Sequence, residues 1–173
     1  MSDEVHPVEF AELPFDRSGS GRDGSIHFRL RPSEPAEDEG EDDAFFAETI
    51  AESVAITALP GAADRLIDGD RIVVEDRPIV LVLDYPMDRA AVSLADPDAG
   101  DDLTLRGLIL ATAEAYRTAF DMERQAYDAF RRGEGITRPP FGIFGHGIDD
   151  LFIEYFAVFD EEDAVWILAA MGS

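Results

Sequence analysis

The segment from Thr104 to Arg132 constrains the fold more than any other part of the chain, because its apolar residues recur at intervals of three and four. This spacing places them on one face of an α-helix of about seven turns. Thr104 is suited to cap the start of this helix, and Gly133 stands where a glycine commonly ends one. We predict a long amphipathic helix over about 104–132, with an apolar face formed by Leu105, Leu108, Ile109, Thr112, Tyr116, Ala119, Phe120, Tyr127 and Phe130. A helix of this kind needs a second layer to cover that face.

Short apolar segments supply the second layer. Ser25–Arg31 alternates apolar and polar residues, as a half-buried strand does. Pro78–Asp84 is apolar on both faces, which is typical of a strand in the centre of a sheet. Leu151–Phe159 and Ala164–Ala170 flank the acidic residues 160–163, and this arrangement predicts an antiparallel hairpin.

Two further strands are expected at Arg71–Glu75 and Ala90–Ala95. Strands joined as hairpins, without a regular alternation of strand and helix, favour an α+β fold. We therefore predict a mostly antiparallel sheet packed against one long amphipathic helix, with a C-terminal β-hairpin.

The length of 173 residues fits one domain. Pro7, Pro14 and the run Ser18–Gly21 predict an irregular arm over residues 1–24, which leaves residues 25–173 as a single α+β domain.

The domain contains one segment of low apolar content. Residues 32–43 are rich in proline, glycine and acidic side chains, so we expect a flexible acidic loop. Asp43 is suited to cap a short helix after this loop. Val54–Leu59 fits the end of that helix and a strand equally well, and the sequence leaves both readings open.

The chain is strongly acidic: 38 Asp and Glu residues against 14 arginines and no lysine give a net charge of −24. Such a charge repels phosphate backbones and anionic lipid surfaces, so we expect neither nucleic acid nor a membrane as a partner. A host with a high-salt interior and a mimic of nucleic acid would each account for it.

The polar, acidic first residues predict a cytoplasmic protein. The absence of cysteine excludes disulfides and thiolate metal sites.

The densest group of chemically active residues lies between Phe141 and Leu151. Three glycines (142, 145 and 147) surround His146, and Asp149 and Asp150 follow it. An imidazole oriented by a carboxylate is the arrangement found in general bases and metal sites. A histidine that locks a tight turn by binding a backbone group gives the same pattern. The sequence is compatible with both.

Two motifs of this half resemble a small uncharacterised family. One is the sequence G-I-[WF]-G-H-x-x-x-D-L at residues 142–151, and the other is Y-x-x-x-[YF]-x-x-E, which begins at Tyr116. A third segment, at residues 83–87, is similar to a tyrosine-proline that ends a strand in the family. The resemblance covers about residues 79–173. This chain has Phe144 where the family has tryptophan, and Gly147 where it has aspartate. The family has no assigned activity, so the resemblance implies architecture rather than function.

Glu123 projects from the apolar stripe of the predicted helix. A carboxylate facing a core is costly unless it is paired. Arg138, His146 and the backbone of a turn are the candidate partners. A buried pair that holds the glycine-rich turn against the helix is one interpretation. The other is that Glu123, His146 and Tyr116 share the wall of a cleft.

No strong catalytic signature is present, so the leading interpretation is a non-catalytic acidic protein that binds or assembles with another protein. Its candidate contact residues are aromatic: Tyr116, Phe141, Phe144 and Phe152. We expect no cofactor and no metal site, and self-association remains open.

Two alternatives belong to other classes. One is a hydrolase or metal-dependent enzyme whose candidate catalytic residues are His146, Asp149, Asp150 and Glu123. The other is a nucleic-acid mimic, which would present rows of carboxylates in place of phosphates.

Overall fold

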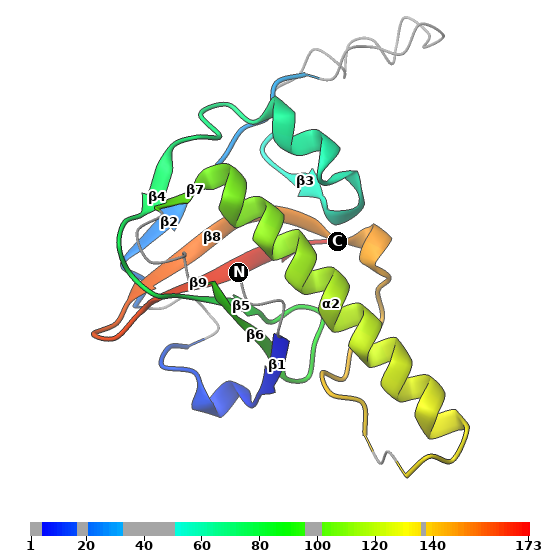
Figure 1. Cartoon of the computed structure of the whole chain (residues 1–173). Helices are drawn as coiled ribbons and strands as arrows, with labels where there is room; N and C mark the ends of the chain where they lie inside the picture. The colour runs from blue at the N-terminus through cyan, green and yellow to red at the C-terminus, as the bar shows by residue number, and fades with distance from the viewer. Residues whose placement is uncertain (1–4, 17–20, 33–50, 96–101, 136–137) are drawn as a thin grey trace, which may run out of the picture.

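The computed structural model describes residues 5–16, 21–32, 51–95, 102–135 and 138–173. The fold is α+β, with a mixed sheet packed against one long helix, α2 (Figure 1). Within the described residues, the sheet has the strand order β1-β6-β5-β9-β8-β2, and β3 pairs with β8. The strands are β1 (Val5–Val8), β2 (Gly24–Ile26), β3 (Val54–Ala55), β5 (Ile79–Leu83), β6 (Ala90–Ala95), β8 (Phe152–Asp160) and β9 (Val165–Gly172). A second ladder pairs β4 (Ile72–Val74) with β7 (Leu103–Thr104).

Strand β5 lies inside the sheet, and all five of its residues are buried. It pairs antiparallel with β6 and parallel with β9. Strands β8 and β9 form the predicted C-terminal hairpin, in which Asp160 pairs with Val165. The sheet is therefore mostly antiparallel, and the β5–β9 pair is its parallel exception.

Helix α2 spans Leu105–Arg131, within one residue of the prediction at each end. The Thr104 hydroxyl accepts a hydrogen bond from the Gly107 backbone N–H at 3.1 Å, which confirms the predicted N-cap. Gly133 has φ +75°, the left-handed conformation that ends many helices. From Leu105 to Phe120, the apolar stripe of α2 packs on one face of the sheet, and the main core lies between them. Tyr127 and Phe130, which the spacing places on the same face, are each 53% exposed because this end of the helix extends beyond the sheet (Figure 1).

The opposite face of the sheet is covered by the N-terminal segment, where a 3₁₀ turn spans Phe10–Glu12. The Phe15 ring stacks on Phe159, with centroids 3.9 Å apart, and meets Trp166 edge-on. Within the predicted irregular arm, Val5–Val8 is thus an edge strand rather than irregular chain. Proline at position 7 is compatible with this strand because an edge strand can lack one ladder N–H.

The segment predicted as a strand at Ser25–Arg31 is only partly one. β2 ends at Ile26, and the chain then leaves the sheet, since Leu30 bridges to Ala51 and Leu66. The predicted alternation persists, with Phe28 and Leu30 buried. The short strand β3 begins at Val54, and a 3₁₀ turn follows it at Ile56–Ala58. Most of the predicted acidic loop at 32–43 and of the helix predicted after Asp43 lies outside the described residues.

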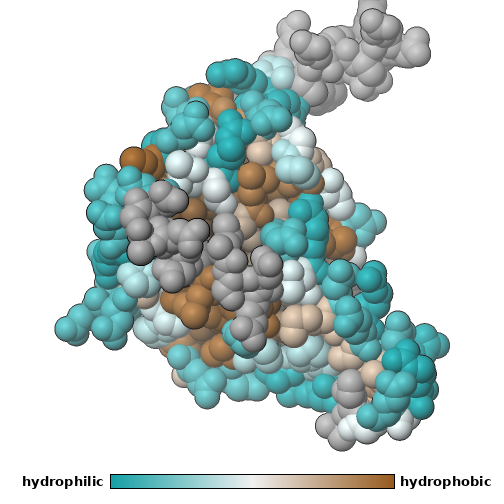
Figure 2. Space-filling view, in the orientation of Figure 1, coloured by the Kyte–Doolittle hydropathy of each residue, from teal (hydrophilic) through white to brown (hydrophobic). Residues whose placement is uncertain are grey.

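Hydrophilic residues dominate the surface in Figure 2 and surround the far end of α2, while hydrophobic residues emerge in separate patches. Among the described residues, no helix combines the length and the apolar character needed to cross a membrane.

Candidate functional sites

The glycine-rich turn is tied to the helix by Glu123. Its carboxylate accepts hydrogen bonds from the backbone N–H groups of Phe141 at 2.9 Å and Ile143 at 3.0 Å. Between these two residues, Gly142 has φ +66°, and a side-chain carbon there would lie 2.8 Å from the Asp88 Cβ. The turn therefore requires glycine at 142 on both conformational and steric grounds. Of the three candidate partners of Glu123, the backbone of the turn is the one to which it is hydrogen-bonded.

His146 binds a different partner. Its Nε2 lies 2.9 Å from the hydroxyl of Tyr85, which is also 3.0 Å from the Ser173 hydroxyl. Tyr85 belongs to the turn after β5, and the Tyr116 hydroxyl donates to its backbone carbonyl at 3.0 Å. The turn is thus joined to the end of the central strand, and that strand end is joined to α2. Hydrogen bonds thus connect Ser173, Tyr85 and His146, whose side chains can all donate and accept hydrogen bonds.

Tyr116 is fully buried beneath this arrangement. Burial raises the pKa of its phenol well above the ordinary value of 10.0, and the negative charge of Asp84 raises it further. The Tyr116 hydroxyl therefore stays protonated and acts as a donor to the Tyr85 carbonyl.

The two acids that follow His146 serve the next element. A 3₁₀ turn spans Ile148–Asp150, and the Asp150 carboxylate accepts a hydrogen bond from the Gly147 backbone N–H at 3.1 Å. The Asp149 carboxylate lies against Gly147, so a side-chain carbon at position 147 would collide with it. Both acids are exposed. In the described contacts, Glu123 and Asp150 thus accept hydrogen bonds from backbone N–H groups, and His146 forms a hydrogen bond with the Tyr85 hydroxyl.

The four candidate contact aromatics divide into two pairs. Phe141 and Tyr116 are fully buried, so they support the core and cannot meet a partner protein in this fold. Phe144 and Phe152 remain 59% and 40% exposed, on either side of the 3₁₀ turn along the chain. The turn thus presents two aromatic side chains with two carboxylates between them in sequence.

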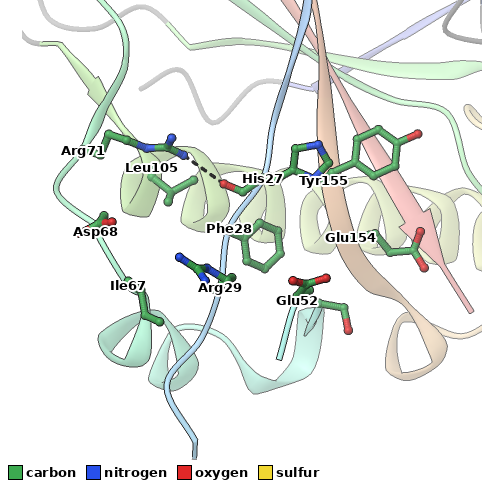
Figure 3. Close-up of a pocket in the computed structure, with 11 residues that line it drawn as sticks. His27, Phe28, Arg29, Glu52, Ile67, Asp68, Arg71, Leu105, Glu154 and Tyr155 are labelled. Carbon is green, nitrogen blue, oxygen red and sulfur yellow. Dashed lines mark hydrogen bonds between the residues drawn. The ribbon is translucent and has the colours of Figure 1, made fainter. Parts of the chain in front are cut away.

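A polar cavity of about 740 Å³ lies at another place in the fold, and sequence reasoning missed it. Its lining comes from five separate segments, which include the chain after β2, the residues before β3 and the start of β8 (Figure 3). His27 and Arg29 fall on the polar side of the predicted strand, a pattern that any surface strand has. Nothing in the sequence connects them with Arg71 or Glu154, because such connections arise only when the chain folds.

No group of three or more histidine, aspartate or glutamate side chains is placed to hold a metal ion within the part of the chain that the structure describes. Neither a family model nor any curated protein or solved structure matches the chain. The functional argument therefore rests on the contacts and charges described above.

Proposed function

We propose that the protein is a non-catalytic interaction module, and that the surface around the glycine-rich turn binds a basic segment of a partner protein. We call this surface the aromatic–acidic patch and define it by Phe144, Asp149, Asp150 and Phe152. The observation that carries the proposal is that both phenylalanines are exposed and flank two exposed carboxylates in the sequence. Exposed aromatic side chains are a common source of binding energy at protein interfaces.

The rigidity of the patch supports the proposal. Glu123 fixes one end of the turn, and the contact between His146 and Tyr85 fixes its middle. The Phe144 backbone N–H also donates to the Pro86 carbonyl at 3.1 Å. A surface held in this way loses little conformational entropy when a partner binds.

Charge determines the class of partner. The carboxylates of Asp149 and Asp150 add to a chain whose net charge is −24. This potential attracts a basic partner and speeds its encounter, while it repels nucleic acid and a second copy of the chain. A peptide with arginine or lysine next to an aromatic or aliphatic anchor would match both parts of the patch.

A displayed library of random peptides, selected against the immobilised protein, tests the proposal. We expect enriched peptides to combine basic and apolar residues and to bind less tightly as salt concentration rises. The double variant F144S/F152S should weaken their binding at least tenfold. D149N should weaken it less and should reduce its dependence on salt.

The double variant Y127S/F130S is the matched control, because these two aromatic residues of α2 are each 53% exposed but lie outside the patch. It should leave the affinity unchanged, and circular dichroism should show that all variants remain folded. A selection without basic peptides, or peptides that bind F144S/F152S as tightly as the natural chain, would overturn the proposal.

A further inference from the structure

The polar cavity has a framework of backbone hydrogen bonds. The Ile67 N–H donates to the Arg29 carbonyl at 2.9 Å, and the Leu30 N–H donates to the Ala51 carbonyl at 2.9 Å. These bonds tie the segment after β2 to two other segments that line the cavity. The floor includes the buried side chains of Phe28 and Leu105. Hydrogen bonds therefore hold the backbone of the walls in place.

Arg71 is fixed at one side of the cavity. Its Nη2 donates to the His27 carbonyl at 3.0 Å, the contact drawn in Figure 3. The tight turn that presents it starts at Asp68, which has φ 57°, and the Arg71 N–H donates to the Asp68 carbonyl. Among the described residues, neither Arg71 nor Arg29 forms an ion pair with a carboxylate. Within this part of the chain, both guanidinium groups therefore retain N–H donors for a carboxylate from outside.

Opposite charges lie across the cavity. In Figure 3, Arg71 stands on one side, and Glu154 stands on the other next to Tyr155. Glu52 lies on the same side of Arg29 as Glu154 does. The His27 ring stacks on Tyr155, with centroids 5.5 Å apart, and forms an aromatic wall near Glu154. A ligand that spans the cavity would meet Arg71, with Asp68 beside it, at one end and the carboxylates of Glu52 and Glu154 at the other.

The net charge of the side chains that line the cavity restricts the class of ligand. Two arginines and three carboxylates (Glu52, Asp68 and Glu154) line the cavity, so these five side chains carry a net charge of −1. Phosphate and other small dianions are repelled by this lining and by the whole chain. A polyamine would satisfy the carboxylates but would face two arginines. A zwitterion with one additional positive charge complements both sides.

We infer that this cavity binds a free basic α-amino acid. Its carboxylate would bind the guanidinium groups of Arg71 and Arg29, and its ammonium groups would bind Glu52 and Glu154. Its aliphatic stem would lie over Phe28 and Leu105. The cavity volume is within the range of small-molecule sites, about 300–1,000 Å³. This inference concerns a site other than the aromatic–acidic patch and does not depend on the function proposed for that patch.

Titration of the full chain with L-lysine, followed through backbone amide signals by NMR, tests the inference. We expect saturable shifts at residues 27–29, 52–53, 68–71 and 154–155. Lysine methyl ester lacks the carboxylate and Nα-acetyl-lysine lacks the α-ammonium, so each should bind at least tenfold more weakly. R71Q should weaken lysine at least tenfold but leave the methyl ester unchanged, and E154Q should reduce the affinity for both.

R124Q is the matched control for R71Q, because Arg124 is an exposed arginine on α2 that lies outside the cavity. It should leave lysine binding unchanged. Three results would overturn the inference: spermidine or inorganic phosphate binding more tightly than lysine, equal affinity of lysine and its methyl ester, or no shifts at tens of millimolar lysine.

Discussion

The carboxylate of Glu123 accepts the backbone N–H of Phe141 at 2.9 Å, and this contact joins the middle of helix α2 to a turn that follows 18 residues later. The same carboxylate accepts the N–H of Ile143 at 3.0 Å. The Glu123 side chain thus accepts hydrogen bonds from two backbone N–H groups of the turn. Among the described residues, these groups form no hydrogen bond within the turn itself. The turn then positions Phe144 and His146, so the geometry of the candidate patch depends on Glu123.

Replacing Glu123 with alanine should lower the free energy of unfolding by about 2 kcal/mol, because hydrogen bonds to a charged acceptor are worth about 1.5–3 kcal/mol and water replaces part of the loss at this half-buried site. Urea unfolding followed by circular dichroism measures the change. Q125A alters an exposed neighbour on the same helix and should change stability by less than about 0.5 kcal/mol. Equal losses in the two variants would show that the Glu123 contacts contribute nothing.

The glycines of the turn should differ in their tolerance of alanine. Gly142 and Gly145 both have positive φ, +66° and +79°. A methyl group at 142 would meet Asp88, whereas one at 145 would meet nothing within 4 Å. G145A should therefore cost about 1 kcal/mol from conformational strain alone, and G142A should cost about 1–2 kcal/mol more. Thermal unfolding of both variants measures this difference, and equal melting temperatures would contradict the steric argument.

The sequence predicts those elements whose pattern is complete within one segment. The apolar stripe from Leu105 onward determines the bounds of α2, and the uniformly apolar Pro78–Asp84 identifies β5 as a central strand. The hairpin of β8 and β9 follows from two apolar runs with an acidic loop between them. In each case, periodicity and turn residues supply enough information.

The sequence does not predict which distant segments contact each other. His146 binds Tyr85, 61 residues earlier, although two carboxylates follow the histidine closely in sequence. The parallel pairing of β5 with β9 and the position of β1 at the sheet edge likewise depend on tertiary packing. Periodicity identifies which face of a segment is buried but not which segment covers it. For the same reason, the sequence gives no sign of the cavity beside Arg71.

Stability should rise with salt, because exposed carboxylates repel one another across the surface of a chain with a net charge of −24. The midpoint of thermal unfolding should increase steadily between about 0.05 M and about 1 M KCl. Neutralising the exposed hairpin loop with E161Q, E162Q and D163N should make this increase smaller. Sucrose in place of salt controls for effects that do not depend on charge. A midpoint that does not change with KCl would contradict the prediction.

Replacing Tyr116 with phenylalanine should lower the free energy of unfolding by about 1–2 kcal/mol near neutral pH, because the Tyr85 carbonyl loses its donor. The loss should shrink in alkaline solution. Burial and the charge of Asp84 raise the pKa of Tyr116 in the folded chain, so above about pH 10 the phenol ionises in the unfolded chain first. The stability that the neutral phenol contributes is complete below that pH and is lost as the pH rises toward the folded-state pKa. Y116F has no group that ionises at this position and lacks this part of the alkaline decline. Urea unfolding of both proteins from about pH 8 to about pH 11 measures the effect, and stability curves that stay parallel across this interval would contradict it.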